Sequence, residues 1–277
     1  MLFGAHVSCA GGIQNAPLNA AKLGCETFQF FSRSPQGGPA PVLTPEIIEA
    51  FKANCAEANL RDWAIHAPYY INFANAEGRI RGNSIRIVRE ELERGTLLGA
   101  SYMMFHPGSA KDVGEEQGLN YVIEGIKKVY DKYEGTTQLL IEISAGAGMV
   151  IGDTFEEVAA MLEGVGHPEL GVCFDTAHAF ASGYDLRTKE TVDETFKKFD
   201  NIIGLKHLKM SHCNDSKVEL GTHKDRHEHL GKGFIGLAGF DAIIHHKKLG
   251  HLNLILETEP DKVGTDLKLL KKMRDGS

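Results

Sequence analysis

The sequence has few cysteines, no long apolar run and no excess of positive charge. Its five cysteines are scattered without a C-x-x-C pair, and an odd number argues against a disulfide framework, so a reducing compartment is favoured. No apolar stretch approaches the roughly 20 residues that span a bilayer. The N-terminus also lacks the basic and apolar regions of a secretory signal. We therefore expect a cytoplasmic protein that is not bound to a membrane.

The sequence also lacks a Gly-rich dinucleotide fingerprint, an internal repeat and a Pro/Gly/Ser linker that would separate two domains. Its 277 residues, of which 42% are hydrophobic and 24% charged, are typical of a globular protein. This length suits one (β/α)8 barrel, for which about 250 residues is typical, as well as two smaller domains. The absence of a linker favours the single barrel.

Eight short segments rich in β-branched and aromatic residues alternate with amphipathic stretches such as 44–58 and 84–98. We predict strands over residues 2–8, 25–32, 62–69, 102–108, 137–144, 170–178, 202–212 and 251–259. This alternation implies parallel strands with right-handed helical crossovers, which can close at eight. We predict an α/β fold, a single-domain (β/α)8 TIM barrel over residues 1–277. An open doubly wound sheet is the alternative, but it would concentrate its site at one switch point.

Six of these segments end in a residue of a type that binds metals. These residues are His66, His106, Glu142, Asp175, His212 and Glu257, and successive ones lie 40, 36, 33, 37 and 45 residues apart. This spacing is roughly one strand-helix unit of a barrel whose strands all end at one mouth. Without cations, six such groups would repel and desolvate each other at a cost of several kcal/mol. We therefore predict a metal site, and His6, which ends the first segment, is a candidate for supporting a ligand.

A polar, histidine-rich segment from 212 to 239 is predicted to be a long functional loop after the seventh strand. Within it Asp225 and His227 are two residues apart and can point to the same side, and Asp175 and His178 form a similar pair. Nine candidate ligands suit three ions, because a catalytic zinc usually takes three protein ligands. Imidazole with carboxylate favours Zn²⁺, with Mn²⁺ or Fe²⁺ as alternatives.

The formal net charge of −7 is unusual for a protein that binds nucleic acid, since basic patches normally contact phosphates. Three divalent ions would bring this charge to −1 and concentrate positive charge at the mouth. Loops after strands two and seven would add three cationic side chains, those of Arg33, Lys217 and Arg226. Tyr69 and Tyr70 follow the ligand of the third strand and could stack on or wedge beside a base, with core packing as the alternative for Tyr70.

Three motifs occur in an order that resembles the endonuclease IV family, the zinc-dependent apurinic/apyrimidinic endonucleases. They are GVCFDTAH at 171–178, HCNDSK at 212–217 and DRH at 225–227, together with His66, His106, Glu142 and Glu257. The resemblance covers nearly the whole chain. It implies a monomer that hydrolyses double-stranded DNA on the 5′ side of an abasic site, leaving a 3′-hydroxyl and a 5′-deoxyribose phosphate. It also implies removal of blocking groups from 3′ ends.

The resemblance further implies a role for each ligand. One zinc would be held by His66, His106 and Glu142, a second by Glu142, Asp175, His212 and Glu257, and a third by His178, Asp225 and His227. Glu142 would bridge the first two ions with a hydroxide, which Glu142 and Glu257 would position. Tyr69 matches a wedge residue of the family. Gln36 stands where the family often has an arginine that enters the base stack, so Arg33 would compensate or recognition would depend more on the two tyrosines.

Two other functions are compatible with parts of this pattern. Sugar isomerases and epimerases share the barrel and a divalent metal site of acids and histidines, but they need one or two ions. The set His178, Asp225 and His227 would have no use in such an enzyme. A metal-dependent DNA-binding or scaffold protein without catalysis is the second alternative, and the complete ligand set argues against it.

Overall fold

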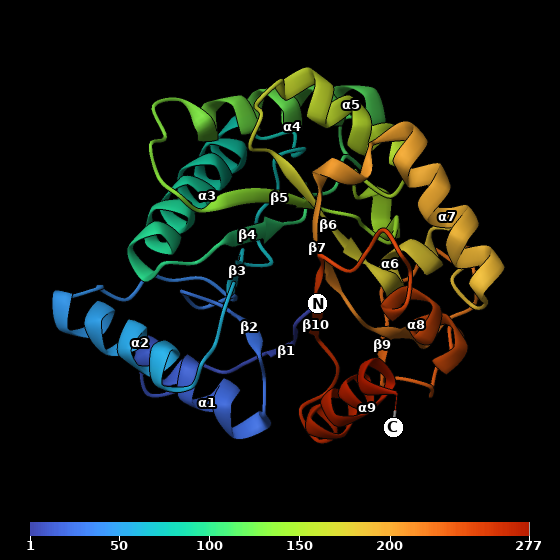
Figure 1. The fold of residues 1–277 in the computed structure, drawn as a ribbon. Coiled ribbons are helices and arrows are strands. Elements are labelled where there is room, and N and C mark those ends of the chain that lie inside the picture. Colours follow the sequence, from blue (N-terminus) through green and yellow to red (C-terminus); the bar gives the residue numbers. More distant parts are fainter. Residues whose placement is uncertain (277) are drawn as a thin grey trace.

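Eight parallel strands form a closed barrel in the computed structural model, which describes residues 1–276 (Figure 1). Neighbouring strands follow chain order around the barrel, and the last pairs with the first. The barrel strands are β1 (Phe3–His6), β2 (Thr27–Phe30), β3 (Ala64–His66), β4 (Tyr102–Phe105), β5 (Gln138–Glu142), β6 (Gly171–Asp175), β7 (Leu208–His212) and β10 (Asn253–Leu256). The predicted TIM barrel is confirmed, and the open sheet is excluded.

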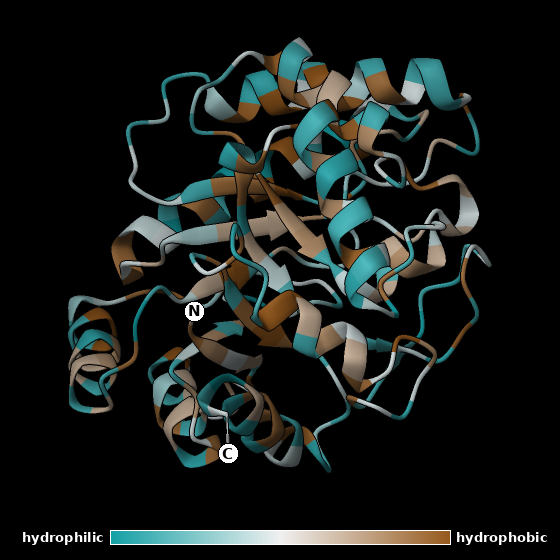
Figure 2. Cartoon of the chain, turned by 45° about the vertical axis from the view of Figure 1, so that its right-hand side comes forward, coloured by the Kyte–Doolittle hydropathy of each residue, from teal (hydrophilic) through white to brown (hydrophobic). Residues whose placement is uncertain are grey.

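Helices surround the barrel and connect its strands (Figure 1). They are α1 (Ala16–Leu23), α2 (Pro45–Glu57), α3 (Gly78–Leu98), α4 (Glu115–Tyr130), α5 (Phe155–Val165), α6 (Thr176–Ala181), α7 (Lys189–Ile202), α8 (Leu237–Ile244) and α9 (Val263–Asp275). Short 3-10 turns, η1 (Ile13–Asn15), η2 (Ala147–Met149) and η3 (Leu205–His207), lie in the connections. Figure 2 shows apolar colour concentrated on the central strands and polar colour on the outer helix surfaces. Each helix thus packs an apolar side against the strands, as its amphipathic pattern requires.

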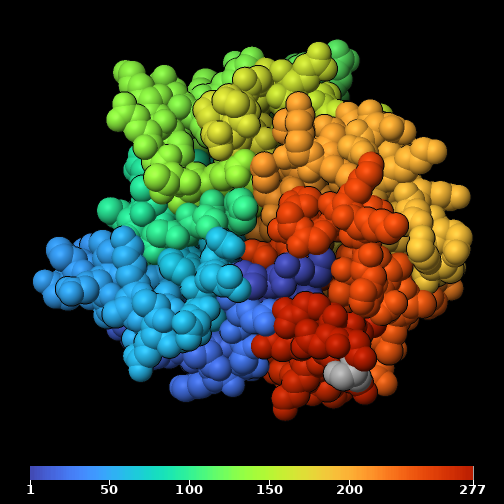
Figure 3. Space-filling model, viewed as in Figure 1, coloured from blue at the N-terminus to red at the C-terminus, as the bar shows by residue number. Residues whose placement is uncertain are grey.

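The first and last segments of the chain close the barrel together. Phe3, Gly4 and Ala5 of β1 pair with Leu254, Ile255 and Leu256 of β10. The N-terminal segment accordingly lies against C-terminal residues in the space-filling view (Figure 3). Within residues 1–276, no helix is long and apolar enough to cross a membrane.

All eight barrel strands are shorter than the predicted segments, and three differences change the element that a residue belongs to. α3 begins at Gly78 rather than near 84. The sequence pattern did not indicate its first two turns, because they are largely exposed and lack an apolar repeat. Residues 176–178, predicted as strand, form the start of α6, whose N-cap is the Asp175 side chain. The segment 202–207, also predicted as strand, contains the end of α7 and the turn η3 before β7 begins at Leu208. Apolar runs of this length do not distinguish a strand from a buried helix end.

Candidate metal centre

The six predicted strand-end ligands converge because each lies two residues beyond an apolar side chain inside the barrel. The interior cluster consists of Ala64, Met104, Leu140, Cys173, Met210 and Ile255. Two residues further on, four strands end at His66, Glu142, Asp175 and His212, and His106 and Glu257 directly follow the last residues of β4 and β10. Side chains two apart on a strand share a face, so these six point into the same mouth.

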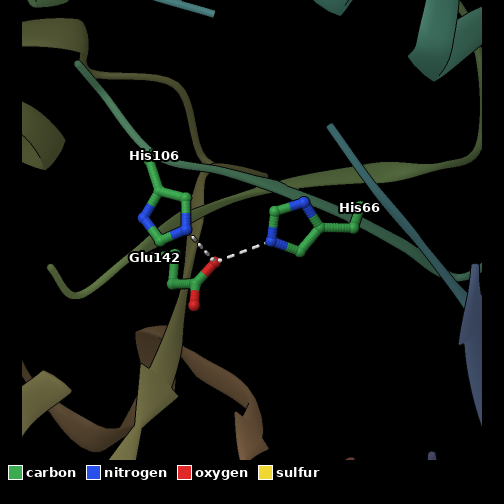
Figure 4. Close-up of side chains that lie close together, drawn as sticks. All are labelled: His66, His106 and Glu142. Atoms are coloured by element: carbon green, nitrogen blue, oxygen red, sulfur yellow. Dashed lines mark ion pairs between the residues drawn. The ribbon is translucent and has the colours of Figure 1, made fainter. Parts of the chain in front are cut away.

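The first group joins β3, β4 and β5 (Figure 4). One oxygen of Glu142, Oε2, lies 3.3 Å from His66 Nε2 and 3.4 Å from His106 Nε2. This oxygen is buried and makes no hydrogen bond within the described residues. Ligands about 2.0–2.1 Å from a tetrahedral zinc stand about 3.3–3.4 Å apart. The spacing and the unpaired oxygen therefore fit a metal ion.

The second group lies deeper and shares Glu142 with the first. His212 Nδ1 faces three carboxylates, at 2.8 Å from Glu142 Oε1, 3.3 Å from Glu257 Oε2 and 3.7 Å from Asp175 Oδ2. His212, Glu142 and Asp175 are completely buried. Three carboxylates, two of them completely buried, carry more negative charge than one imidazole can neutralise, so this donor set also fits a divalent cation.

The third group combines the start of α6 with the loop after β7. His178 Nε2 lies 3.2 Å from Asp225 Oδ1 and 3.3 Å from His227 Nε2, and His227 Nε2 lies 3.4 Å from Asp225 Oδ1. These three atoms form a nearly equilateral triangle of the size that a tetrahedral zinc requires. Asp175 lies beside it, with Oδ2 3.7 Å from His227 Nε2. All nine predicted ligands are thus brought together at one mouth.

The predicted loop 212–239 has an internal framework and ends where α8 begins at Leu237. A short antiparallel hairpin pairs β8 (Asp215–Ser216) with β9 (His227–Glu228). The buried carboxylate of Asp215 accepts hydrogen bonds from the backbone amides of Ser216, Gly231, Gly233, Ile235 and Gly236. One carboxylate therefore gathers the segment that follows β9, while the hairpin pairs His227 with Ser216.

Burial and mutual charge shift the pKa values of the ligand candidates in opposite directions. Burial raises the pKa of Glu142, but the surrounding histidines outweigh it and hold that pKa well below the ordinary value. Glu257 behaves in the same way, and its pKa is lowered to about 2. Burial lowers the pKa of His178, but Asp175 and Asp225 outweigh it and raise that pKa to about 10. Without metal the His178 ring therefore holds a proton and pairs with Asp175 and Asp225, so metal binding there must displace that proton.

Arg33 does not lie where the sequence predicted. Its side chain is buried, with the residue only 5% exposed, and its Nε donates to Glu91 Oε1 at 2.6 Å. Glu90 Oε2 lies 2.9 Å from its Nη2. Arg94 donates to Ser32 Oγ and to the Ser32 carbonyl beside this pair, so the cluster ties the loop after β2 to α3. Arg33 is therefore held within the protein and not presented to an anionic substrate, and it cannot compensate for Gln36.

The other predicted contact residues lie on loops at or near the mouth. Gln36 is exposed on the loop after β2. Tyr69 is 69% exposed, and its ring packs edge-on against Phe31 with centroids 5.2 Å apart. Tyr70 is half-buried and packs partly against the core, the alternative considered for it. Lys217 and Arg226 are exposed on the loop after β7.

Two adjoining cavities open over the ligands. One of about 500 Å³ is lined by His66, His106, His178, Asp225, His227 and Glu257 together with Tyr69, Lys217 and Arg226. The other, about 440 Å³, lies between Tyr69, Tyr70 and the loop after β5. A separate cavity of about 700 Å³ lies between α7 and α8, away from this chemistry. The mouth can therefore admit a substrate group directly over the ligands.

Two buried amides that the sequence analysis did not identify support the second group. Gln29 contacts both His212 and Glu257, and Asn214 donates to Asp175 Oδ2 at 2.8 Å while accepting from the Glu257 backbone amide. Asn214 lies inside the quoted HCNDSK motif, and Gln29 is the single amide in the apolar strand TFQF. A polar residue one position before the end of a buried strand was the available indication.

The closed barrel places the chain among the xylose isomerase-like TIM barrels. The family model of that description matches residues 17–273. A protein of Campylobacter curvus described as "Probable endonuclease 4" is 40% identical over 278 residues, covering 99% of this chain and 98% of its own. One of Campylobacter concisus with the same description is 41% identical over 98% of this chain and 97% of its own. The chain belongs to the endonuclease IV family.

Solved structures agree with this assignment. The crystal structure of endonuclease IV from Thermus thermophilus superposes with a TM-score of 0.87 at 31% identity, covering 100% of both chains. A D-tagatose 3-epimerase-like protein superposes with a TM-score of 0.77, covering 99% of this chain and 97% of its own. Its identity is only 18%, so this second likeness shows the fold alone.

Proposed function

We propose that the protein is a DNA-repair endonuclease that hydrolyses the phosphodiester bond on the 5′ side of an abasic site. The products would be a 3′-hydroxyl and a 5′-deoxyribose phosphate, and the same chemistry would remove blocking groups from 3′ ends. The observation that carries the proposal is the convergence of nine ligand-type residues at the mouth of a barrel 40% identical to a "Probable endonuclease 4". We further propose that these residues hold three zinc ions, with Mn²⁺ or Fe²⁺ as possible substitutes.

The three groups would divide the metals as their geometry divides the ligands. His66, His106 and Glu142 would hold one ion, and Glu142, Asp175, His212 and Glu257 a second. His178, Asp225 and His227 would hold the third. Bound divalent cations would supply Lewis-acid chemistry, lowering the pKa of water and neutralising charge on phosphate oxygens.

The chain's own residues would bind and orient the substrate. Glu257 is ionised at neutral pH, because its pKa is about 2, so with Glu142 it can accept a hydrogen bond from the attacking water and orient it. Lys217 and Arg226 line the cavity over the ligands and offer positive charge to the DNA backbone. Tyr69 presents an exposed ring beside both cavities and can stack on a base next to the lesion.

The third group favours a nuclease over a sugar epimerase. Its three atoms lie within 3.4 Å of one another, and His178, Asp225 and His227 line the cavity over the other ligand candidates. A phosphodiester offers several charged oxygens to adjacent cations, whereas a neutral sugar needs one or two ions to polarise its hydroxyl and carbonyl groups.

The test is cleavage of a labelled duplex with one tetrahydrofuran abasic analogue. We expect purified protein with about three metal ions per chain to cut on the 5′ side of the analogue, leaving an end that a polymerase extends. The matched undamaged duplex should stay intact. Equal cutting of both duplexes, or no cutting together with conversion of D-tagatose to its 3-epimer, would overturn the proposal.

We also infer that the protein acts as a monomer in a reducing, cytoplasmic environment. Every ligand candidate comes from one chain, so the site needs no second copy. All five cysteines, which lie within the described residues, are free.

A further inference from the structure

Gln29 is a completely buried amide in the middle of the site, on a strand that contributes no metal ligand. Its residue exposure is 0%. A buried amide without partners destabilises the folded protein, so its hydrogen bonds must be accounted for. Its Nε2 lies 2.7 Å from Glu257 Oε1 and 3.0 Å from His6 Nδ1, and its Oε1 lies 2.7 Å from His212 Nε2. Both the nitrogen and the oxygen of the amide are therefore hydrogen-bonded.

The chemistry of Glu257 determines which way this amide points. An ionised carboxylate can only accept hydrogen bonds, so the Nε2 of Gln29 must face Glu257. An amide nitrogen can only donate, so His6 accepts its second hydrogen through Nδ1, 3.0 Å away. The Oε1 of Gln29 consequently faces His212, whose Nε2 must carry a hydrogen and donate it.

Two other histidines of the site are held at Nδ1 by backbone carbonyls, and their Nε2 atoms face the ligands of their own groups. His66 Nδ1 lies 2.6 Å from the Ala67 carbonyl, and His178 Nδ1 lies 3.0 Å from the Ile143 carbonyl. His212 has the reverse arrangement, with Nδ1 toward the carboxylates and Nε2 toward Gln29. Its Nε2 thus contacts a side chain from β2, 183 residues away in sequence, and not a backbone carbonyl.

We propose that Gln29 is a positioning residue that selects the ligand atoms of the second metal group. By occupying His212 Nε2 it leaves His212 Nδ1 for the metal, and by occupying Glu257 Oε1 it leaves Glu257 Oε2, which lies 3.3 Å from that nitrogen. One amide thus fixes the tautomer of one ligand and the orientation of another. The inference rests on the proposed metal site but not on the identity of the substrate.

The test compares Gln29→Met with Gln138→Met. Methionine keeps the length of glutamine but offers no strong hydrogen bond, and Gln138 begins β5 at the opposite end of the barrel. Zinc content is followed while a chelator lowers the free zinc concentration. We expect Gln29→Met to bind one ion about 10–100-fold more weakly and the other ions normally. Gln138→Met should match the wild type. Unchanged affinity for every ion in folded Gln29→Met would overturn the proposal.

A measurement on the wild-type protein keeps the proposal testable if Gln29→Met does not fold. In the zinc-loaded protein, ¹⁵N NMR of the His212 ring should show zinc on Nδ1 and an exchange-protected hydrogen on Nε2. Zinc on Nε2 would overturn the proposal. Neither readout uses DNA, so failure to cut an abasic duplex would refute the proposed function while these results still decided the role of Gln29.

Discussion

The mouth of the barrel and the interior just below it are built by the same strands, two residues apart, and differ completely in chemistry. Leu140 and Glu142 on β5 are both buried and both point inward. The interior cluster contains only apolar side chains and one thiol, Cys173, whose pKa burial raises to about 12. It is therefore uncharged at neutral pH, whereas the mouth contains imidazoles and carboxylates in contact.

This difference shows how the fold supports a site that is unfavourable by itself. Buried charges cost several kcal/mol each unless they are paired, and the mouth pairs them only partly without metal. The interior cluster contributes favourable apolar burial on the same strands. Stability should therefore depend mainly on the interior positions and catalysis on the mouth positions, which substitutions on one strand can test.

The largest expected effect is the loss of cleavage in Glu142→Gln. Glutamine has nearly the same shape but lacks the charge that two metal groups share, so we expect cleavage of the abasic duplex to fall by at least about 10³-fold. Zinc content should also fall, while the circular dichroism spectrum stays that of the folded protein. Glu124→Gln on the exposed surface of α4 is the control and should cut normally. Near-normal cleavage by Glu142→Gln would contradict the bridging role.

The second prediction uses the neighbouring interior position, Leu140. Leu140→Ala removes a completely buried side chain and leaves a cavity, so we expect a loss of about 2–5 kcal/mol in the free energy of unfolding. Cleavage per folded molecule and zinc content should stay at the wild-type level. Leu97→Ala, at a 49% exposed position on α3, is the control and should change stability little. Loss of cleavage in Leu140→Ala with unchanged stability would show that stability and catalysis do not divide between the interior cluster and the mouth.

The sequence was sufficient to predict the barrel and the positions of the nine ligand candidates, for a physical reason. Strand-helix alternation and strand-end chemistry are local patterns, and a closed barrel brings all strand ends to one place. Arg33 was misplaced because its partner Glu91 lies 58 residues away on α3, and no local pattern gives the rotation of that helix against the loop. Gln29 was missed for the same reason, since its partners come from β7 and from the end of β10.

The smallest expected effect concerns Glu157, a buried carboxyl outside the ligand set. Burial raises its pKa to about 7, with Asp153 and Glu115 adding to the shift, although the Gly152 amide donates to its Oε2 at 2.7 Å. Its environment therefore contrasts with that of Glu142, whose pKa the histidines lower. A buried carboxyl thus keeps its charge at the mouth only because cationic groups surround it.

A raised carboxyl pKa means that the folded protein holds this proton more tightly than the unfolded chain. Below pH 4.5 this carboxyl therefore does not reduce the free energy of unfolding. Its destabilising effect grows as the pH rises to about 7 and is constant above that pH. Relative to wild type, the free energy of unfolding of Glu157→Gln should be higher by up to about 3 kcal/mol at pH 8 and unchanged at pH 4. Urea unfolding of both proteins at each pH measures this difference. The exposed Glu156→Gln is the matched control, and an equal gain at both pH values would refute the raised pKa and leave the contrast with Glu142 unsupported.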